Sequence, residues 1–316
     1  MTLAKLALSL GLIAAFWAGF ALYVQQRAAR HEARIEARFA PQGRFVSIDG
    51  ARVHYLEQGA GEAIVLIHGA SGNALDLATP LMAELAKTHR VIAFDRPGLG
   101  WSDPIPNEAS LTAQALHLAK AAQAIGVQNP VLVGQSYGGS VALAWALEAR
   151  LPPRALVLIS APSLPWPGKL DIWYRITTTA FGRAVALPLA TAFLPQSYLD
   201  TTITGIFAPD AVPEAYSKTI AAALALRRAS LQTNVIQVNG LRAEVVAMAP
   251  RYSELSLPVE LLHGMADSIV PARIHSIPLA ERLPNARLTL FETTGHMPHY
   301  SHSAAVLAAI ERAALR

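Results

Sequence analysis

A serine between two glycines carries the clearest chemical signal in this chain. Ser136 is the centre of the pentapeptide Gly-Gln-Ser-Tyr-Gly at residues 134–138, which follows the apolar run 131–133 and precedes a helical pattern. A serine hydroxyl is a weak nucleophile, and a tight strand-to-helix turn with flanking glycines exposes it to substrate. The free N–H groups at the start of the next helix would face an oxyanion formed there. The pentapeptide therefore predicts an acyl-transfer nucleophile.

Two later segments offer partners for this serine. His296 follows a predicted strand at 286–291, and a neutral imidazole can take the serine proton and return it to a leaving group. Asp267 comes four residues after the predicted strand that ends at His263, and it would orient His296. We therefore predict Ser136, Asp267 and His296 as a catalytic triad, in the chain order Ser, Asp, His.

Backbone amides are predicted to complete the site. The sequence His-Gly-Ala at 68–70 follows the strongly apolar run 63–67, so it lies at the end of a strand. The amides of Ala70 and Tyr137 are the expected donors of an oxyanion hole, which stabilises the tetrahedral intermediate of acyl transfer.

These motifs together resemble the α/β-hydrolase family over roughly residues 43–316. The resemblance rests on the following segments: a hairpin at Asp49-Gly50, His68-Gly69, Phe94-Asp-Arg-Pro-Gly-Leu-Gly-Trp-Ser102, the serine pentapeptide, His263-Gly-x-x-Asp267 and Gly295-His296. The branch with this pattern includes ester hydrolases, C–C bond hydrolases, haloperoxidases, epoxide hydrolases and haloalkane dehalogenases. Because the last two carry aspartate at the nucleophile position, Ser136 favours acyl transfer.

Other polar residues receive structural interpretations. His68 and His263 each precede a glycine at a strand end, where buried hydrogen bonding is expected. Asp95 competes with Asp267 as the triad acid, but we expect it to fix the turn at 97–98. Asp171 and Asp210 lie in the region between core strands and are disfavoured as the acid.

The spacing His296-x-x-His299-x-x-His302 suggests metal binding. It lacks an adjacent glutamate or cysteine ligand set, so we predict no metal. The triad chemistry requires no cofactor either.

Composition limits the class of protein. Residues are 53% hydrophobic and 15% charged, which provides for a sizeable core. The net charge of +4 is spread without a nucleic-acid motif, so no nucleic-acid partner is expected. The absence of cysteine excludes disulfides and thiol catalysis.

The N-terminus is a separate region. The run Leu6–Val24 has no charged side chain and is long enough to span a bilayer, so we assign residues 1–25 to a membrane anchor. A cleaved signal peptide is the alternative, although no clean cleavage site follows Val24. One lysine, Lys5, precedes the run and four arginines follow it, which points the body of the protein toward the cytoplasm.

Residues 26–42 are predicted to continue this helix as a basic stalk. Arginine and alanine recur there at helical spacing, and the Pro-Gln-Gly sequence at 41–43 ends the helix. The stalk is interpreted either as a solvated spacer or as a segment that lies on anionic lipid.

Residues 43–316 predict one α/β domain. Eight strands are expected, at 44–48, 52–57, 63–67, 90–94, 130–134, 154–160, 257–263 and 286–291. Helices are expected at 77–88, 111–125, 139–150 and 301–314. The last six strands are almost continuously apolar, which is typical of a parallel sheet covered by helices on both faces.

The alternation stops between residues 161 and 256, which predicts an inserted helical cap. Seven of its aromatic side chains are candidates to line a pocket above Ser136, although packing within the cap explains any single one as well: Trp166, Trp173, Tyr174, Phe181, Phe193, Tyr198 and Phe207. As a group they suggest an apolar substrate.

The predicted function is a membrane-anchored serine hydrolase that cleaves a carboxylic ester of an apolar small molecule or lipid. A first alternative is C–C bond hydrolysis or perhydrolysis by the same triad, because a polar side chain in the segment 71–73 would help to polarise a ketone. A second is a membrane-tethered binding module without catalysis. The sequence leaves the physiological substrate and the oligomeric state open.

Overall fold

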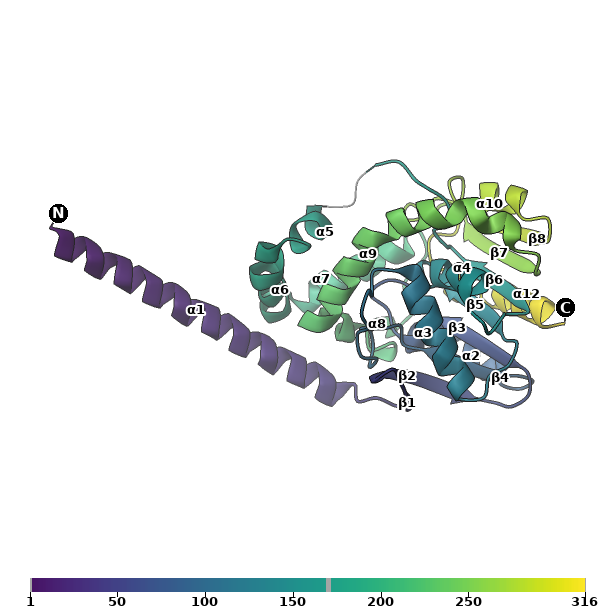
Figure 1. Ribbon diagram of the computed structural model, residues 1–316, viewed down its shortest axis with the longest axis horizontal. Helices are drawn as coiled ribbons and strands as arrows, with labels where there is room; N and C mark the ends of the chain where they lie inside the picture. Colours follow the sequence, from purple (N-terminus) through teal and green to yellow (C-terminus); the bar gives the residue numbers. More distant parts are fainter. Residues whose placement is uncertain (1, 169–171, 316) are drawn as a thin grey trace.

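An eight-stranded sheet forms the centre of the computed structural model, which describes residues 2–168 and 172–315 (Figure 1). The strand order is β1-β2-β4-β3-β5-β6-β7-β8. Strands β1 and β2 pair antiparallel, as do β2 and β4, and all other neighbours are parallel. The strands are Arg44–Ile48, Ala51–Gln58, Ala63–Ile67, Arg90–Phe94, Val131–Gln135, Ala155–Ile159, Val259–Gly264 and Ala286–Phe291.

The eight predicted strands are all present, and each end lies within two residues of its predicted position. The apolar runs have a direct cause in the sheet. Alternate residues of β3 face opposite sides, so that Val65 and Ile67 join one buried cluster while Ile64 and Leu66 join another. Because both faces are covered, every position along β3 is apolar.

Helices cover the two faces of the sheet. Helices α3 and α4 belong to the first cluster, and α2 and α12 to the second. The helices of the core are α2 Ala74–Leu85, α3 Leu111–Ala124, α4 Tyr137–Glu148, α10 Ser276–Arg282, α11 Pro298–Ser301 and α12 Ser303–Ala314. Helix α10 was not predicted. Helix α2 begins three residues earlier than predicted because the Asn73 side chain accepts the Leu75 N–H at 3.0 Å and so caps it.

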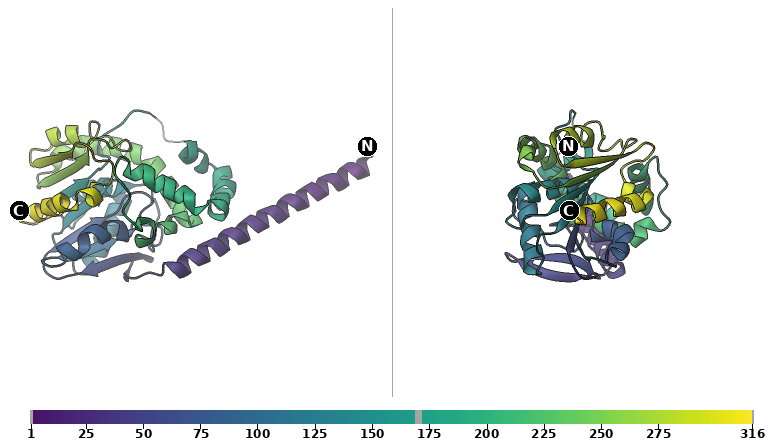
Figure 2. Two further views of the ribbon diagram at one scale, coloured as in Figure 1. Left: turned by 180° about the vertical axis from the view of Figure 1, so that it is seen from behind. Right: turned by 90° about the vertical axis from the view of Figure 1, so that its right-hand side faces the viewer.

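A helical cap connects β6 to β7, as the sequence predicted (Figure 2). Its helices are α5 Ile172–Thr177, α6 Leu187–Phe193, α7 Gln196–Phe207, α8 Tyr216–Thr219 and α9 Arg228–Met248, with shorter helical turns at Gly182–Ala186, Ala222–Leu226 and Ala249–Glu254. Helix α9 is the longest of these and runs from the neighbourhood of α1 to the core (Figure 1).

Helix α1, Leu3–Arg38, is unbroken, and its N-terminal part projects away from the rest of the chain (Figures 1 and 2). By length and composition it is apolar and long enough to cross a membrane.

The C-terminal half of α1 packs against the cap. Val24 and Ala28 are buried against Ala192 of α6, and Ile35 joins a buried cluster with α7 and α8 side chains. A purely solvated spacer, one of the two predicted interpretations, therefore does not describe this segment.

Polar contacts reinforce this packing. Arg228, at the start of α9, donates to Glu32 from its backbone N–H at 2.7 Å and from its guanidinium at 2.6 Å. Arg227 forms a second ion pair with Glu36 at 3.1 Å. The Arg27 guanidinium donates to the Ala192 carbonyl at 2.8 Å. These four contacts join α1 to α6 and α9, and we call them the α1–cap junction.

Candidate active site

Ser136 lies on a strained turn between β5 and α4. Its φ of 49° and ψ of −125° are unusual for a residue with a side chain. The turn is held by a 2.8 Å hydrogen bond from the Ser136 N–H to the Ile159 carbonyl. Gly138 must be glycine, since a Cβ there would overlap the carbonyl oxygens of Ile67 and His68. The local sequence thus raises the serine at the carboxyl edge of the sheet.

The structure brings Asp267 and His296 together. The Nδ1 of His296 is 2.7 Å from Oδ2 of Asp267, and both side chains are buried. The carboxylate accepts backbone N–H groups of Ile269 and Val270 at 2.9 Å on its other oxygen. Because an ionised Asp267 accepts a hydrogen bond from Nδ1–H, the Nε2 of His296 is left as the proton acceptor.

Burial opposes ionisation of Asp267, but hydrogen bonds with His263 and His296 outweigh it, so the pKa of this carboxyl is well below its ordinary value. His263 lies 3.2 Å from Oδ2 through Nε2, which also contacts the Val270 carbonyl at 2.6 Å. His263 therefore has the buried hydrogen-bonding role that was predicted for it.

Ser136 and His296 line one cavity of about 340 Å³, which we call the Ser136 cavity. Its described lining residues are Ala70, Ser71, Gly72, Asp76, Gln135, Ser136, Tyr174, Leu199, Thr202, Ile203, Ile206, Tyr216, Ile220, Ala222, Ala225, Ile269, His296 and Met297. Core loops supply the polar groups and cap helices supply most of the apolar ones.

The two predicted oxyanion donors lie beside the serine. Tyr137 is the first residue of α4, so its N–H has no partner within that helix. Ala70 lines the Ser136 cavity, and Gly69 before it lies so close to the Ser136 turn that a Cβ there would be 3.2 Å from the Cβ of Ser136. Ala70 and Tyr137 therefore both adjoin Ser136, and the role of their amides as oxyanion donors stays a prediction.

Arg96, which sequence reasoning did not single out, holds the Ala70 loop in place. Its side chain is fully buried and donates to the carbonyls of His68 and Gly69, both at 3.0 Å. It also donates to the side chains of Gln114 at 2.8 Å and Gln237 at 2.6 Å. Burial lowers the pKa of Arg96 to about 10, so it remains charged at neutral pH. Its position in the Asp-Arg-Pro-Gly stretch, which carries part of the family resemblance, was the signal in the sequence that could have identified it.

His68 has a structural role, as predicted. It accepts the Arg96 N–H at 2.9 Å through Nε2 and lies 2.8 Å from the Gly69 carbonyl through Nδ1. Burial, and then the charge of Arg96, lower the pKa of His68 to about 3, so this ring is neutral.

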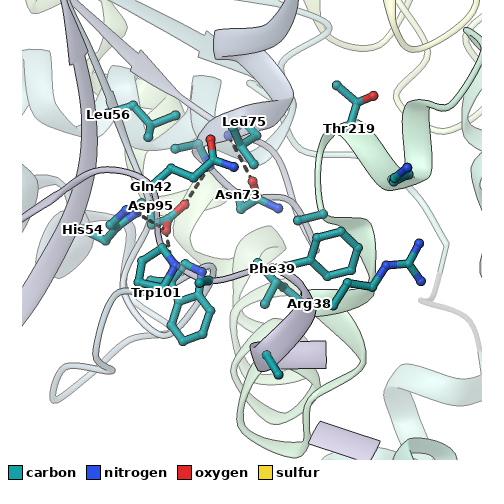
Figure 3. A pocket seen from close by; sticks show the side chains of 17 residues that line it. Arg38, Phe39, Gln42, His54, Leu56, Asn73, Leu75, Asp95, Trp101 and Thr219 are labelled. Atoms are coloured by element: carbon teal, nitrogen blue, oxygen red, sulfur yellow. Dashed lines mark hydrogen bonds and ion pairs between the residues drawn. The ribbon is translucent and has the colours of Figure 1, made fainter. Parts of the chain in front are cut away.

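Asp95 also acts as a support, and it does so more widely than predicted. Its carboxylate contacts His54 Nδ1 at 2.7 Å and accepts the backbone N–H groups of Ala74 at 2.6 Å and Trp101 at 2.7 Å (Figure 3). It thereby fixes the 96–101 loop together with β2 and the start of α2. Asp95 lines a second cavity of about 320 Å³ beside the end of α1 and is not among the residues that line the Ser136 cavity.

Two further aspartates lie near the site; Asp210 was disfavoured only as the triad acid, and Asp76 was not singled out from the sequence. Asp210 of the cap accepts the Gly295 N–H at 2.9 Å and so supports the loop that carries His296. Asp76, on the first turn of α2, lines the Ser136 cavity itself. Asp171 lies outside the described residues.

The histidines that follow His296 have separate surroundings. His302 lies 2.7 Å from the Thr294 hydroxyl and stacks on Phe291. His299 is fully buried, and burial lowers its pKa to about 3. Within residues 2–168 and 172–315, no group of three or more metal-ligating side chains is found.

The predicted pocket aromatics of the cap mostly have other locations. Tyr174 lines the Ser136 cavity. Phe207 packs against Tyr216 and Tyr300, with ring centroids 4.8 and 5.6 Å away. Trp166 packs on His275, and three others are exposed on the cap surface: Phe181, Phe193 and Tyr198. Most of the cap residues that line the cavity are aliphatic instead, and Leu199, Ile203 and Ile206 of α7 are three of them.

Comparison with known proteins assigns the class. The model of the alpha/beta hydrolase fold family matches residues 62–303, and the chain belongs to this family. A 2-hydroxymuconate semialdehyde hydrolase of Pseudomonas putida is 30% identical over 268 residues, which cover 83% of this chain and 90% of that enzyme. With hydrolases among its relatives, the chain is an α/β-hydrolase enzyme.

Solved structures share the fold. An esterase from Exiguobacterium antarcticum has a TM-score of 0.67 and 18% identity, and the match covers 86% of this chain and 99% of that one. A bacterial membrane phospholipase A has a TM-score of 0.65 and 23% identity, with 98% and 99% of the chains covered. Coverage of 98% requires that most of α1 is included in the second match.

Proposed function

We propose that this protein is a membrane-anchored serine hydrolase that cleaves carboxylic esters of apolar small molecules or lipids. The observation that carries the proposal is the strained Ser136 turn in the same cavity as His296, whose Nδ1 lies 2.7 Å from a buried Asp267. These are the nucleophile, the base and the group that orients the base.

In the proposed reaction, His296 Nε2 takes the proton of the Ser136 hydroxyl as Oγ attacks the ester carbonyl. The amides of Ala70 and Tyr137 stabilise the oxyanion, and the protonated His296 returns its proton to the leaving alcohol. Water, activated by the same imidazole, then attacks the acyl-enzyme and releases the acid. Asp267 keeps the His296 ring oriented and stabilises its charged form throughout.

The apolar walls of the cavity favour a substrate with an apolar acyl group. Leu199, Ile203 and Ile206 of α7, with Ile220, line it from the cap side. Burying an acyl chain against such side chains contributes about 0.8 kcal/mol per CH₂ group, so activity should rise with chain length until the cavity is filled.

The membrane attachment rests on α1. Its apolar segment would span the bilayer, and the excess of arginine after that segment directs the body to the cytoplasm. A reporter fused to the C-terminus, active only on one side of the membrane, tests this orientation. Activity of a periplasmic reporter would contradict it.

The decisive experiment uses the full chain in detergent micelles with p-nitrophenyl esters of increasing acyl length. Ser136→Ala should abolish turnover, while Ser197→Ala, at an exposed position of α7, serves as the matched control and should retain it. Equal turnover in wild type and Ser136→Ala would refute the proposal. A folded wild type inactive on all esters favours the alternatives below.

C–C bond hydrolysis is the second candidate, since relatives include 2-hydroxymuconate semialdehyde hydrolases. The segment 71–73 was expected to offer a polar side chain that polarises a ketone. Asn73 is not free for this role, since its side chain donates to the Ile220 carbonyl at 2.7 Å and caps α2, whereas Ser71 lines the Ser136 cavity. Asp76 places a carboxyl group in the Ser136 cavity, which opposes an anionic substrate such as a muconate. Loss of dienoate absorbance is the direct assay for C–C hydrolysis, and peroxide-dependent formation of a peracid is the direct assay for perhydrolysis.

A further inference from the structure

A second carboxyl group faces the Ser136 cavity, and the proposed reaction does not use it. Asp76 is 5% exposed and lies on the first turn of α2. Among the described residues that line this cavity, it is the only aspartate or glutamate, and none is lysine or arginine. A buried carboxyl group without a cationic partner requires hydrogen-bond donors.

The two oxygens of Asp76 have different surroundings. Oδ1 accepts the Tyr216 hydroxyl at 2.8 Å, and the buried Nε2 of His299 is 4.0 Å from the same oxygen. Oδ2 points toward Gly72 in the oxyanion loop, since a Cβ at that glycine would lie 3.6 Å from it. The Tyr300 hydroxyl is near this carboxyl and donates to the Asp76 backbone carbonyl, and within the described ranges Oδ2 has no hydrogen bond of its own that meets distance and angle criteria. A carboxylate oxygen has two acceptor sites, so Oδ2 is available to a ligand.

The charge of Asp76 suits the binding of a donor. Burial raises the pKa of this carboxyl to about 6, against the opposing effects of hydrogen bonding by Tyr216 and Tyr300 and of the nearby His296. The group is therefore largely ionised at neutral pH. An anionic acceptor forms stronger hydrogen bonds than a neutral one.

The position of Asp76 relative to His296 indicates which end of the substrate it meets. Helix α11 begins two residues after His296, and its Tyr300 hydroxyl donates to the Asp76 carbonyl at 2.9 Å. In the proposed mechanism His296 protonates the departing alcohol, so the alcohol portion lies on this side. The aliphatic wall of α7 is left for the acyl chain.

We propose that Asp76 binds a hydroxyl group on the alcohol portion of the ester, as in a glycerol monoester, and thereby determines specificity. This inference rests on the ester hydrolysis proposed above. It predicts discrimination between esters that differ only in the hydroxyl groups of the alcohol portion, because a site built to pair a polar group rejects the analogue that lacks it.

The test compares 1-monooctanoylglycerol with propyl octanoate, using the full chain in detergent and release of octanoic acid as the readout. Wild type should favour the glycerol ester in kcat/KM by about tenfold or more. Equal efficiency on both esters would leave ester hydrolysis standing and overturn the role of Asp76. Inactivity on both would refute ester hydrolysis itself.

Variants separate recognition from folding. Asp76→Leu combined with Tyr216→Phe removes both members of the buried hydrogen bond, which avoids leaving one unpaired. This double variant should lower the preference ratio about tenfold or more, whereas Tyr216→Phe alone should keep it within about threefold of wild type.

Should the double variant fail to fold, Asp76→Asn replaces it. The amide keeps the shape and one acceptor but loses the charge, so the ratio should fall by about threefold or more. A purely structural Asp76 would predict equal losses on both esters in either variant, and that result would overturn the inference.

Discussion

The core and the cap hold their polar groups in different ways. In the core, Asp95 and Arg96 are buried and bonded to several backbone groups each. The cap instead meets α1 through ion pairs that are partly exposed, such as Glu32 with Arg228 and Glu36 with Arg227. Buried, fully paired groups fix a geometry, whereas exposed pairs contribute little stability. The core therefore holds its polar groups in a fixed geometry, whereas the polar contacts between the cap and α1 hold the cap less firmly.

Backbone strain differs between the two regions as well. In the core, the left-handed conformation of Ser136 belongs to the nucleophile turn. In the cap, Ala215 and Ala221 are left-handed at φ of 57° and 51° on either side of α8. These alanines flank the helix that carries Tyr216 to Asp76. The cap thus has strained connections where it meets the cavity.

The largest expected effect is on kcat, from a substitution of Asp267 in the core. Asp267→Asn should lower kcat about 10⁴-fold, because an amide neither holds the required tautomer of His296 nor stabilises its charged form. Steady-state hydrolysis of p-nitrophenyl esters measures the effect. Asp200→Asn, on the exposed surface of α7, is the matched control and should leave kcat unchanged. A loss below tenfold in Asp267→Asn would exclude this residue as the triad acid.

Removing the buried guanidinium tests whether the core depends on its polar network. Arg96→Met leaves the carbonyls of His68 and Gly69 without donors, so the free energy of unfolding should fall by about 3 kcal/mol or more. Activity should fall with it because the Ala70 amide is no longer fixed. Denaturant titration provides the measurement. Exposed Arg287→Met should change stability by less than about 0.5 kcal/mol, and a similar value for Arg96→Met would contradict the network's importance.

The pH dependence of stability tests the contact between core and cap at Asp76, which accepts the hydroxyl of Tyr216. Because the pKa of folded Asp76 is raised to about 6, folding favours its protonated form, and its contribution to stability declines as pH rises from about 4 to 6. Asp76→Asn should therefore gain stability relative to wild type across this window, by up to about 3 kcal/mol. Unfolding at pH 4, 6 and 8 measures the difference. The groups that face this carboxyl are Tyr216, Tyr300, His296 and His299. Parallel pH profiles for variant and wild type would show that Asp76 does not titrate in this range.

The smallest expected effect on stability comes from a substitution in the α1–cap junction. Glu32→Gln should cost less than about 1 kcal/mol of global stability, since the pair is partly exposed. Cleavage of the cap by chymotrypsin, whose targets include exposed Phe181 and Tyr198, should nevertheless accelerate. The charge exchange Glu32→Arg with Arg228→Glu should restore slow cleavage. Unchanged cleavage in Glu32→Gln would mean that apolar packing alone holds the cap to α1.

Local signals explain what the sequence predicted well. The last six strands were found because each is a short, mostly apolar run, and Ser136, Asp267 and His296 each follow a strand within a few residues. Such patterns depend on neighbours along the chain. The carboxyl ends of parallel strands meet at one edge of the sheet, so placement of the site followed from the strand order of the family.

Contacts between distant segments explain what was missed. The Arg96–Gln237 bond and the Glu32–Arg228 pair join residues that are far apart in the sequence, so no local pattern predicts either contact. The role of Asp76 depends on Tyr216 of the cap, and that of Asp210 on the loop before His296. A single sequence contains these residues but not their pairings, because tertiary packing alone brings them together.

Helix α1 couples the rotation of its apolar N-terminal segment to the position of its contacts with the cap. As one continuous helix of 36 residues, it fixes the angular position of the face that carries Glu32 relative to the apolar segment before it. Inserting one residue near Gln25 would turn that face by about 100°, away from Arg228, while seven residues would bring it back to within about 20°. The apolar segment therefore cannot rotate about the helix axis without also moving the residues that contact the cap.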